Sequence, residues 1–166
     1  TSNALFELTL HRSFPEARIR VIDSTRGSTG CGYFQQKGNV QKYILRYKPH
    51  LLVIGGISHG FAIEPIRDVI QQVRKKSQCA ILILTPPIAP QDFLEKASYG
   101  ARGDLRPESL HVFREFPAKL EKMAADERVE FYDMRAHWLE YLRQSYRPAS
   151  YFMRDGVHAN IRGKVI

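Results

Sequence analysis

The stretch Leu51-Leu52-Val53-Ile54-Gly55-Gly56 is a nearly continuous apolar run that ends abruptly at glycines. It forms the body of a strand that we expect over residues 50–55. A second run of this kind occupies residues 80–84, and shorter ones occupy residues 19–22 and 129–132. Strands without apolar–polar alternation are typical of parallel sheets that helices cover on both faces. We therefore expect these runs to be strands of one parallel sheet.

Amphipathic stretches lie between the apolar runs. Apolar residues recur at helical spacing within residues 4–13, 40–47, 63–73 and 134–142, which predicts a helix in each stretch. Pro65 would stand in the first turn of its helix, where proline is tolerated. Alternating strands and helices favour an α/β fold with a parallel sheet.

The order of the elements is unusual at the start of the chain. Folds of this class usually begin with a strand that leads into the first helix, whereas here the helix at residues 4–13 comes first. We expect one domain over residues 1–166, truncated at its N-terminus, with the missing strand upstream of Thr1.

The composition narrows the range of partners. The formal net charge is +8, but the basic residues are dispersed, and the run Arg74-Lys75-Lys76 closes a predicted helix, where cations suit the helix dipole. We therefore expect no nucleic-acid partner, and an acidic polysaccharide or solubility explains the charge equally well. No apolar run approaches the roughly 20 residues that span a bilayer, so no membrane segment is expected.

The cysteines and histidines give no sign of a cofactor. Cys31 and Cys79 lie far apart without C-x-x-C spacing, so neither a zinc site nor a disulfide framework is indicated. Cys79 opens an apolar run and is expected to be a small core residue. Because ligand spacing such as H-E-x-x-H is also absent from the sequence, we expect no metal and no cofactor.

The strand at residues 50–55 leads into Gly56-Ile57-Ser58-His59. Ligands of open parallel sheets bind beyond the carboxyl ends of the strands. Gly56, Ser58 and His59 therefore stand where functional groups are expected. A Gly-rich turn in which Ser58 caps the next helix fits the same residues.

Residues 23–32 form a second loop after a predicted strand and contain Gly27, Gly30 and several hydroxyl side chains. Such a loop exposes backbone N–H groups that can hold a phosphate or an oxyanion. The glycine spacing is neither G-x-G-x-x-G nor that of a P-loop, so nucleotide binding has little support. An ordinary loop is the alternative.

Near the C-terminus the chain reads Asp155-Gly156-Val157-His158. A carboxylate at this spacing can accept the imidazole N–H within one turn, which fixes the tautomer and stabilises the imidazolium. In the alternative interpretation, Asp155 only caps a closing helix.

The proline-rich residues 86–107 are expected to form a long functional loop.

Taken in this order, these loops resemble those of the SGNH (GDSL-type) hydrolase family. In that family a Gly-Asp-Ser nucleophile follows the first strand, a glycine follows the second, a G-x-N-D motif follows the third, and D-x-x-H lies near the C-terminus. The resemblance spans essentially the whole chain and implies a three-layer, flavodoxin-like fold. The matching positions are Gly30 for the loop glycine, with Gly27 as the less favoured alternative, Gly56, Ser58 and His59 for G-x-N-D, and Asp155 and His158 for D-x-x-H.

The resemblance also implies a serine esterase mechanism. A serine upstream of Thr1 would attack the ester carbonyl, with His158 as general base and Asp155 orienting it. The N–H groups of that serine and of Gly30 would meet the oxyanion, with Ser58 as a further donor. Family members of this size often deacylate carbohydrates, which makes an esterified carbohydrate, or another small ester, the expected partner.

Two alternatives stay open. Ser58 and His59 stand where the family has asparagine and aspartate, which favours a non-catalytic relative that binds carbohydrate. The loop after residues 19–22 favours, more weakly, a flavodoxin-like nucleotide or flavin binder.

Ser2 is only a fallback nucleophile, because it lacks the Gly-Asp lead and would lie too far inside the first helix. The sequence itself assigns no compartment, although carbohydrate-active relatives imply secretion or the periplasm.

Overall fold

The computed structural model describes residues 2–27, 29–55, 62–86, 107–147, 151–154 and 158–165; for residues 2–3 and 107–114 it describes only the helical backbone. Its sheet has three parallel strands in the order β1-β2-β3, which are β1 (Leu51–Ile54), β2 (Ala80–Leu84) and β3 (Glu130–Tyr132). The helices are α1 (Ser2–Ser13), α2 (Cys31–Phe34), α3 (Asn39–Tyr43), α4 (Ile63–Arg74), α5 (Pro107–Asp126) and α6 (Met134–Ser145), with 3-10 turns η1 (Leu45–Tyr47) and η5 (Gly163–Val165).

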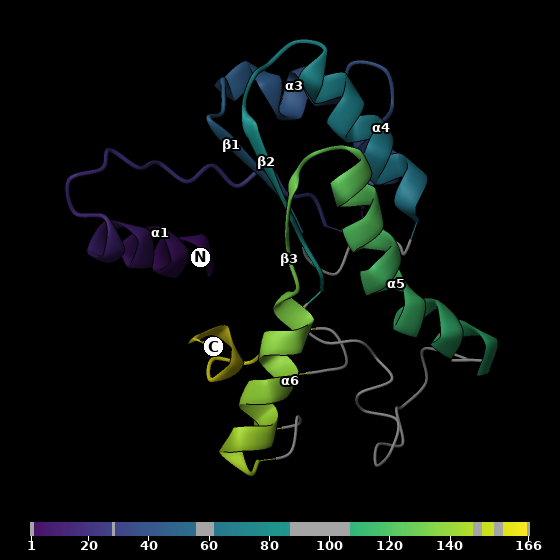
Figure 1. The fold of residues 1–166 in the computed structure, drawn as a ribbon. Helices are drawn as coiled ribbons and strands as arrows, with labels where there is room; N and C mark the ends of the chain where they lie inside the picture. Colours follow the sequence, from purple (N-terminus) through teal and green to yellow (C-terminus); the bar gives the residue numbers. More distant parts are fainter. Residues whose placement is uncertain are drawn as a thin grey trace.

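One face of the sheet is sealed by helices. Helices α4 and α5 lie on the same side of the strands (Figure 1). The strand register places Ile54 beside Ile83 on this face, and both side chains are buried. The core beneath the helices is formed by apolar residues that are almost fully inaccessible to solvent: Ile66, Val69, Ile70, Val73, Ile81, Ile83, Phe116, Leu120 and Met123.

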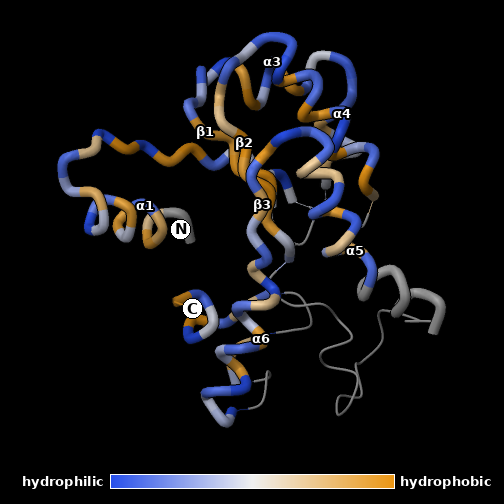
Figure 2. Tube along the Cα trace, in the orientation of Figure 1, coloured by the Kyte–Doolittle hydropathy of each residue, from blue (hydrophilic) through white to orange (hydrophobic). Residues whose placement is uncertain are grey.

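The other face of the sheet exposes apolar side chains. Leu51 and Val53 of β1 keep 51% and 41% of their surface accessible. Helix α1 stands on this side of the strands (Figure 1) and also leaves Phe6 and Leu8 exposed. Figure 2 shows further apolar residues in the segment that connects α1 to the rest of the molecule. This face therefore lacks the close packing of the α4–α5 side within the described part of the chain.

Three of the strands expected from the sequence are confirmed, at residues 51–54, 80–84 and 130–132. The strand expected at residues 19–22 is wrong for this structure: the segment has no regular secondary structure and does not pair with the sheet. Its Val21 N–H donates instead to Glu7 Oε1 at 3.2 Å. An extended segment becomes a strand only when a neighbour accepts its backbone hydrogen bonds, and no described residue supplies such a neighbour.

The helices expected from amphipathic spacing are confirmed for α1, α4 and α6. The stretch 40–47 divides into α3 and η1 at Ile44, whose φ of −122° is not helical. Pro65 lies in the first turn of α4, as predicted. No helix in the described residues is long and apolar enough to cross a membrane.

Candidate functional site at the carboxyl edge of the sheet

The carboxyl ends of β1, β2 and β3 meet at one edge because the strands are parallel. Gly55 follows β1 directly, and a Cβ added there would lie 2.9 Å from Leu84 Cβ. Only glycine therefore lets the chain leave β1 so close to the end of β2. The predicted residues Gly56, Ser58 and His59 come next and lie outside the described residues.

A buried polar contact ties the ends of β2 and β3 together. Thr85 is completely buried, and its hydroxyl donates to Asp133 Oδ1 at 2.8 Å and accepts from Arg135 N at 3.0 Å. Asp133 also caps α6 by accepting from Ala136 N at 3.2 Å. Because a buried hydroxyl is costly to leave unpaired, this arrangement fixes the start of α6 against the sheet edge. The sequence did not single out either residue.

Helix α6 holds the C-terminal segment through a second, smaller core. Trp138 of α6 is buried together with Phe152 and Met153. The Phe152 ring also meets the rings of Tyr141 and Tyr151 edge-on, at centroid distances of 5.6 Å and 5.0 Å. The segment that leads to His158 is thus anchored on α6, and through α6 on the edge of the sheet (Figure 1).

His158 lies on one arm of a short hairpin. Met153 and Ala159 form an antiparallel bridge, Arg154 N donates to His158 O at 2.8 Å, and Asn160 N donates to Phe152 O at 2.9 Å. His158 itself is exposed. The sequence reading of a closing helix at this point is wrong, because the chain forms this hairpin and then the 3-10 turn η5. Asp155 and Gly156 lie outside the described residues, so the predicted Asp155–His158 contact stays a prediction.

Asn160 closes the hairpin and was not predicted as a site residue. Its amide donates to Tyr151 O at 2.9 Å, and its Oδ1 accepts from Arg162 N at 2.9 Å and from Gly163 N at 3.2 Å. Gly163 packs so closely that an added Cβ would lie 2.2 Å from Phe152 O. The turn chemistry of Asn160-Ile161-Arg162-Gly163 is the signal that indicates this arrangement.

Gly30, the predicted oxyanion donor, precedes α2. It is extended, with φ of −131° and ψ of −164°, and its carbonyl accepts from Tyr33 N at 3.0 Å. Among the described residues nothing accepts a hydrogen bond from the Gly30 N–H. Cys31 follows in the main core, where burial raises the pKa of its thiol to about 11. Gly30 itself is half-buried, and its predicted role as an oxyanion donor stays a prediction.

The loop before Gly30 is fixed by aromatic contacts. Ser24 Oγ donates to Tyr43 O, and the Arg26 guanidinium lies over the rings of Tyr33 and Tyr43, with its Cζ 5.3 Å and 4.9 Å from their centroids. Tyr33 donates to the Tyr43 hydroxyl at 3.1 Å. That hydrogen bond raises the pKa of Tyr33 and lowers the pKa of Tyr43.

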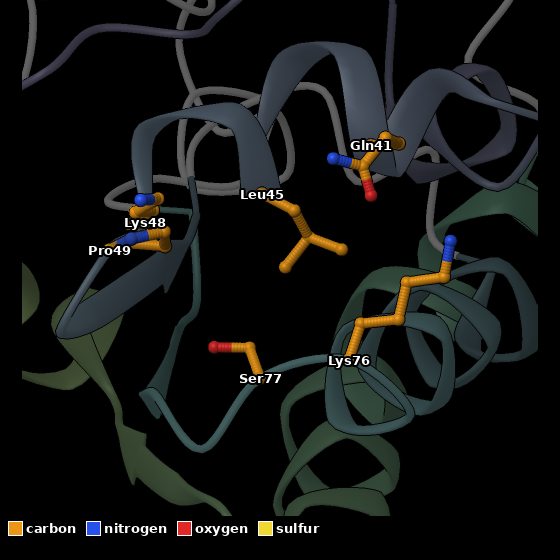
Figure 3. A pocket seen from close by; sticks show the side chains of 6 residues that line it. All are labelled: Gln41, Leu45, Lys48, Pro49, Lys76 and Ser77. Atoms are coloured by element: carbon orange, nitrogen blue, oxygen red, sulfur yellow. The ribbon is translucent and has the colours of Figure 1, made fainter.

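A pocket of about 310 Å³ lies at the opposite, amino edge of the sheet. The residues around it precede β1 and β2 or belong to α3 and η1, and they carry two lysines; they are Gln41, Leu45, Lys48, Pro49, Lys76 and Ser77 (Figure 3). We nevertheless place the candidate site at the carboxyl edge, because ligands of open parallel sheets bind beyond the carboxyl ends of the strands. Residues 56–61 and 87–106, which follow β1 and β2 there, lie outside the described residues.

Of the predicted site residues, the structure describes Gly30 and His158. Each stands on its own built element, Gly30 at the start of α2 and His158 on the hairpin held by α6. The other predicted residues fall outside the described residues, as do residues 87–106 of the long loop expected at residues 86–107, whose last residue, Pro107, begins α5. The structure therefore shows how Gly30 and His158 are each held in place. It does not describe the other residues that are predicted to join them at the site.

Known structures share this fold. The chain is similar to an acetyl xylan esterase (AlAXEase), with a TM-score of 0.70 and 17% identity over 97% of this chain and 83% of the other. It is also similar to a mutant of Axe2, an acetyl-xylooligosaccharide esterase from Geobacillus Stearmophilus, with a TM-score of 0.72 and 15% identity over 99% of this chain and 76% of the other. No model of a protein family matches the sequence, and no curated protein matches it significantly.

These similarities define the class of fold. The chain has the α/β fold of acetyl esterases, with a parallel sheet and packed helices, and the SGNH-type resemblance drawn from the sequence is confirmed at the level of the fold. At these identities the similarity extends to the fold and not to the activity.

Proposed function

We propose that the chain is the body of a serine ester hydrolase of SGNH type that removes acetyl or similar acyl groups from carbohydrate. The observation that carries this proposal is the hairpin that carries His158 and packs against α6 through Trp138, in a fold that acetyl esterases share. The nucleophile in this proposal is a serine from a strand upstream of Thr1.

The free edge of β1 supports the place of that strand. The strand order β1-β2-β3 leaves the other edge of β1 without a partner among the described residues, and Leu51 and Val53 are exposed beside it. Exposed apolar edges favour the addition of another strand. A parallel strand beside β1 would end at the carboxyl edge, where the chain after it could continue into α1.

The proposed reaction assigns one role to each of these groups. The serine hydroxyl adds to the ester carbonyl while His158 accepts its proton, and Asp155 orients the imidazole. The N–H of Gly30 and the serine N–H stabilise the oxyanion, with Ser58 as a further donor. The intermediate collapses, the C–O bond to the sugar breaks, and His158 returns the proton to the sugar oxygen. Water then releases the acyl group by the same steps.

The decisive experiment is hydrolysis of p-nitrophenyl acetate by the protein with its natural upstream residues. Replacement of His158 by alanine should lower kcat/KM by about 10²–10⁴-fold, because general-base catalysis contributes that much. His11→Ala, on the exposed helix α1, is the matched control and should leave the rate unchanged. Equal rates for His158→Ala and the unmodified protein would reject the proposed role of His158.

The upstream strand has its own test. Residues 1–166 alone should hydrolyse the ester no faster than His158→Ala does, whereas the longer protein should be active. Replacement of the upstream serine by alanine should abolish that gain. Full activity of residues 1–166 alone would contradict an upstream nucleophile and redirect attention to Ser2.

A non-catalytic carbohydrate-binding protein is the second candidate. Ser58 and His59 in place of asparagine and aspartate favour it, because loss of one oxyanion donor costs about 10²–10³ in rate. Ser58→Asn separates the two candidates. In an esterase it should raise kcat, and in a binding protein no hydrolysis should appear in either form.

A further inference from the structure

Two arginines converge on Tyr151, at the base of the hairpin that carries His158. The Cζ atoms of Arg147 and Arg162 lie 5.3 Å and 4.6 Å from the centroid of the Tyr151 ring. The edge-on contact with Phe152 sets the orientation of that ring. Tyr151 remains 39% exposed, so the cluster of these two arginines and Tyr151 faces solvent.

The backbone of the cluster is well supported. Arg147 follows the end of α6, where its N–H donates to Ser145 Oγ at 3.2 Å. Arg162 N donates to Asn160 Oδ1 at 2.9 Å, and the Asn160 amide in turn donates to Tyr151 O at 2.9 Å. Asn160 therefore links Arg162 to the tyrosine on which its guanidinium rests.

The charge of the cluster is not balanced within the described part of the chain. Neither the Arg147 nor the Arg162 guanidinium meets a carboxylate there, in contrast to Arg143, which pairs with Glu140 at 2.7 Å. A guanidinium on an exposed aromatic ring gains only about 0.5–1 kcal/mol. Two like charges held near one ring favour an anion, and the planar guanidinium binds a carboxylate through two parallel hydrogen bonds.

Part of the cluster shares a hairpin with His158. Asn160 faces Phe152 across the hairpin, so Tyr151 is level with residue 161, which is three residues beyond His158. Tyr151 and Arg162 therefore belong to the two arms of the same hairpin that carries His158. A sugar whose ester reaches His158 could then place a neighbouring residue against the arginines.

We propose that Arg147, Arg162 and Tyr151 form a binding subsite for a carboxylate of the substrate, so that the preferred ester is carried by an acidic, uronic-acid-bearing glycan. This inference rests on the proposed esterase function, from which it takes the ester. The net charge of +8 agrees with an acidic partner. Arg147 and Arg162 act in binding, whereas the chemical step belongs to His158.

The first test compares acetylated xylo-oligosaccharides with and without a glucuronic acid substituent, using the protein with its natural upstream residues. Arg162→Gln and Arg147→Gln should each raise KM for the acidic substrate by about 10-fold, since hydrogen bonds to charged groups are worth about 1.5–3 kcal/mol. KM for the neutral substrate and kcat for both should stay unchanged. Equal effects on both substrates would overturn the proposal.

Arg46→Gln is the matched control. The Arg46 guanidinium also rests on a tyrosine, with its Cζ 5.0 Å from the Tyr47 centroid, but it belongs to η1 before the amino end of β1. Its replacement removes the same charge and the same kind of contact. A KM increase for the acidic substrate as large as that of Arg162→Gln would show a general effect of charge and reject the subsite.

Calorimetric titration separates this inference from the proposed function because binding needs no catalysis. The non-acetylated acidic oligosaccharide should bind the unmodified protein at least about 10-fold more tightly than the neutral one, and Arg162→Gln should remove the difference. Binding of this kind without hydrolysis would reject the esterase while the subsite stands. Hydrolysis without any preference for the acidic ligand would reject the subsite alone.

Discussion

The two faces of the sheet differ sharply although the same strands form both. On the α4–α5 face, Ile54 and Ile83 are buried side by side and the helices close over them. On the other face, Leu51 and Val53 are about half exposed, and the apolar residues of α1 are exposed as well. Strand β1 carries large apolar residues on both faces, so the difference in their burial arises from what covers them.

This comparison shows that the described residues pack the α4–α5 side of the sheet closely and leave the other side open. Burial of apolar surface supplies most of the stabilisation of a domain, and the α4–α5 face holds nearly all of that burial here. The open face and α1 offer apolar surface for each other and for an added strand. We therefore expect mutations on the two faces to have unequal effects.

The largest expected difference comes from the same substitution at two leucines. Leu120→Ala, on the sealed side, should lower the free energy of unfolding by about 2–5 kcal/mol through the cavity that it leaves. Leu51→Ala, on the open face, should cost less than about 1 kcal/mol. Urea denaturation of both variants measures the difference. If the two costs were equal, the open face would be covered in solution.

The same pair also tests the added strand. If the proposed upstream strand pairs with β1, the cost of Leu51→Ala in the longer protein should rise to about 2 kcal/mol or more, because a buried leucine is then truncated. The cost of Leu120→Ala should stay as it was. An unchanged cost at Leu51 would contradict the addition of a strand beside β1.

Two glycines allow a similar comparison between a tightly packed position and an open one. Gly163→Ala should destabilise by about 1–3 kcal/mol, because its Cβ would collide with Phe152 O and approach Trp138. Gly27→Ala is the control, since no atom lies within 4 Å of the added Cβ. Thermal unfolding of both variants, followed by tryptophan fluorescence, decides the matter. A neutral Gly163→Ala would mean that the hairpin packs less tightly than described.

Thr85 tests the polar end of the sealed face. Thr85→Val keeps the shape but removes the hydroxyl that bonds Asp133 and Arg135 N, and it should cost about 1–3 kcal/mol. Thr85→Ser keeps the hydroxyl and should cost less. Hydrogen exchange at the start of α6 should quicken in Thr85→Val only. Equal stability of the two variants would argue against a structural role for the hydroxyl.

The smallest effect concerns an exposed ion pair on α6. The side-chain hydrogen bond from Arg143 is the main reason that the pKa of Glu140 falls from 4.5 to about 2. A lowered carboxyl pKa means that the contribution of the pair is complete above about pH 4.5 and is lost as the pH falls toward 2. An NMR titration of the Glu140 carboxyl measures the shift. Arg143→Gln should return the midpoint toward 4.5, and an unchanged midpoint would contradict the pairing.

The sequence predicted the sealed part of the fold better than its edges. The runs at residues 50–55 and 80–84 are strands, as continuous apolar sequence predicts, and helices cover the face of these strands that carries Ile54 and Ile83. Residues 19–22 have the same pattern, but a strand also needs a neighbour, which no local pattern supplies. The break at Ile44 likewise depends on backbone packing rather than on apolar spacing.

The candidate site was predicted less completely than the fold. The D-x-x-H pattern located His158, but the expected helix is a hairpin, in which the Asn160 side chain bonds four backbone groups. Thr85 and Asp133 are far apart in the sequence and meet only after β2 and β3 pair. Such contacts follow from topology, and the sequence alone does not encode them in any short motif.

Cys31 offers a direct measure of how often the region around Gly30 opens. Its thiol is buried, and its pKa of about 11 keeps it protonated at neutral pH, so an alkylating reagent reacts with it only when the chain opens locally. Cys79 is less buried and serves as the internal reference. The ratio of the two alkylation rates therefore reports the local opening equilibrium beneath α2, with and without a ligand, and needs no added probe.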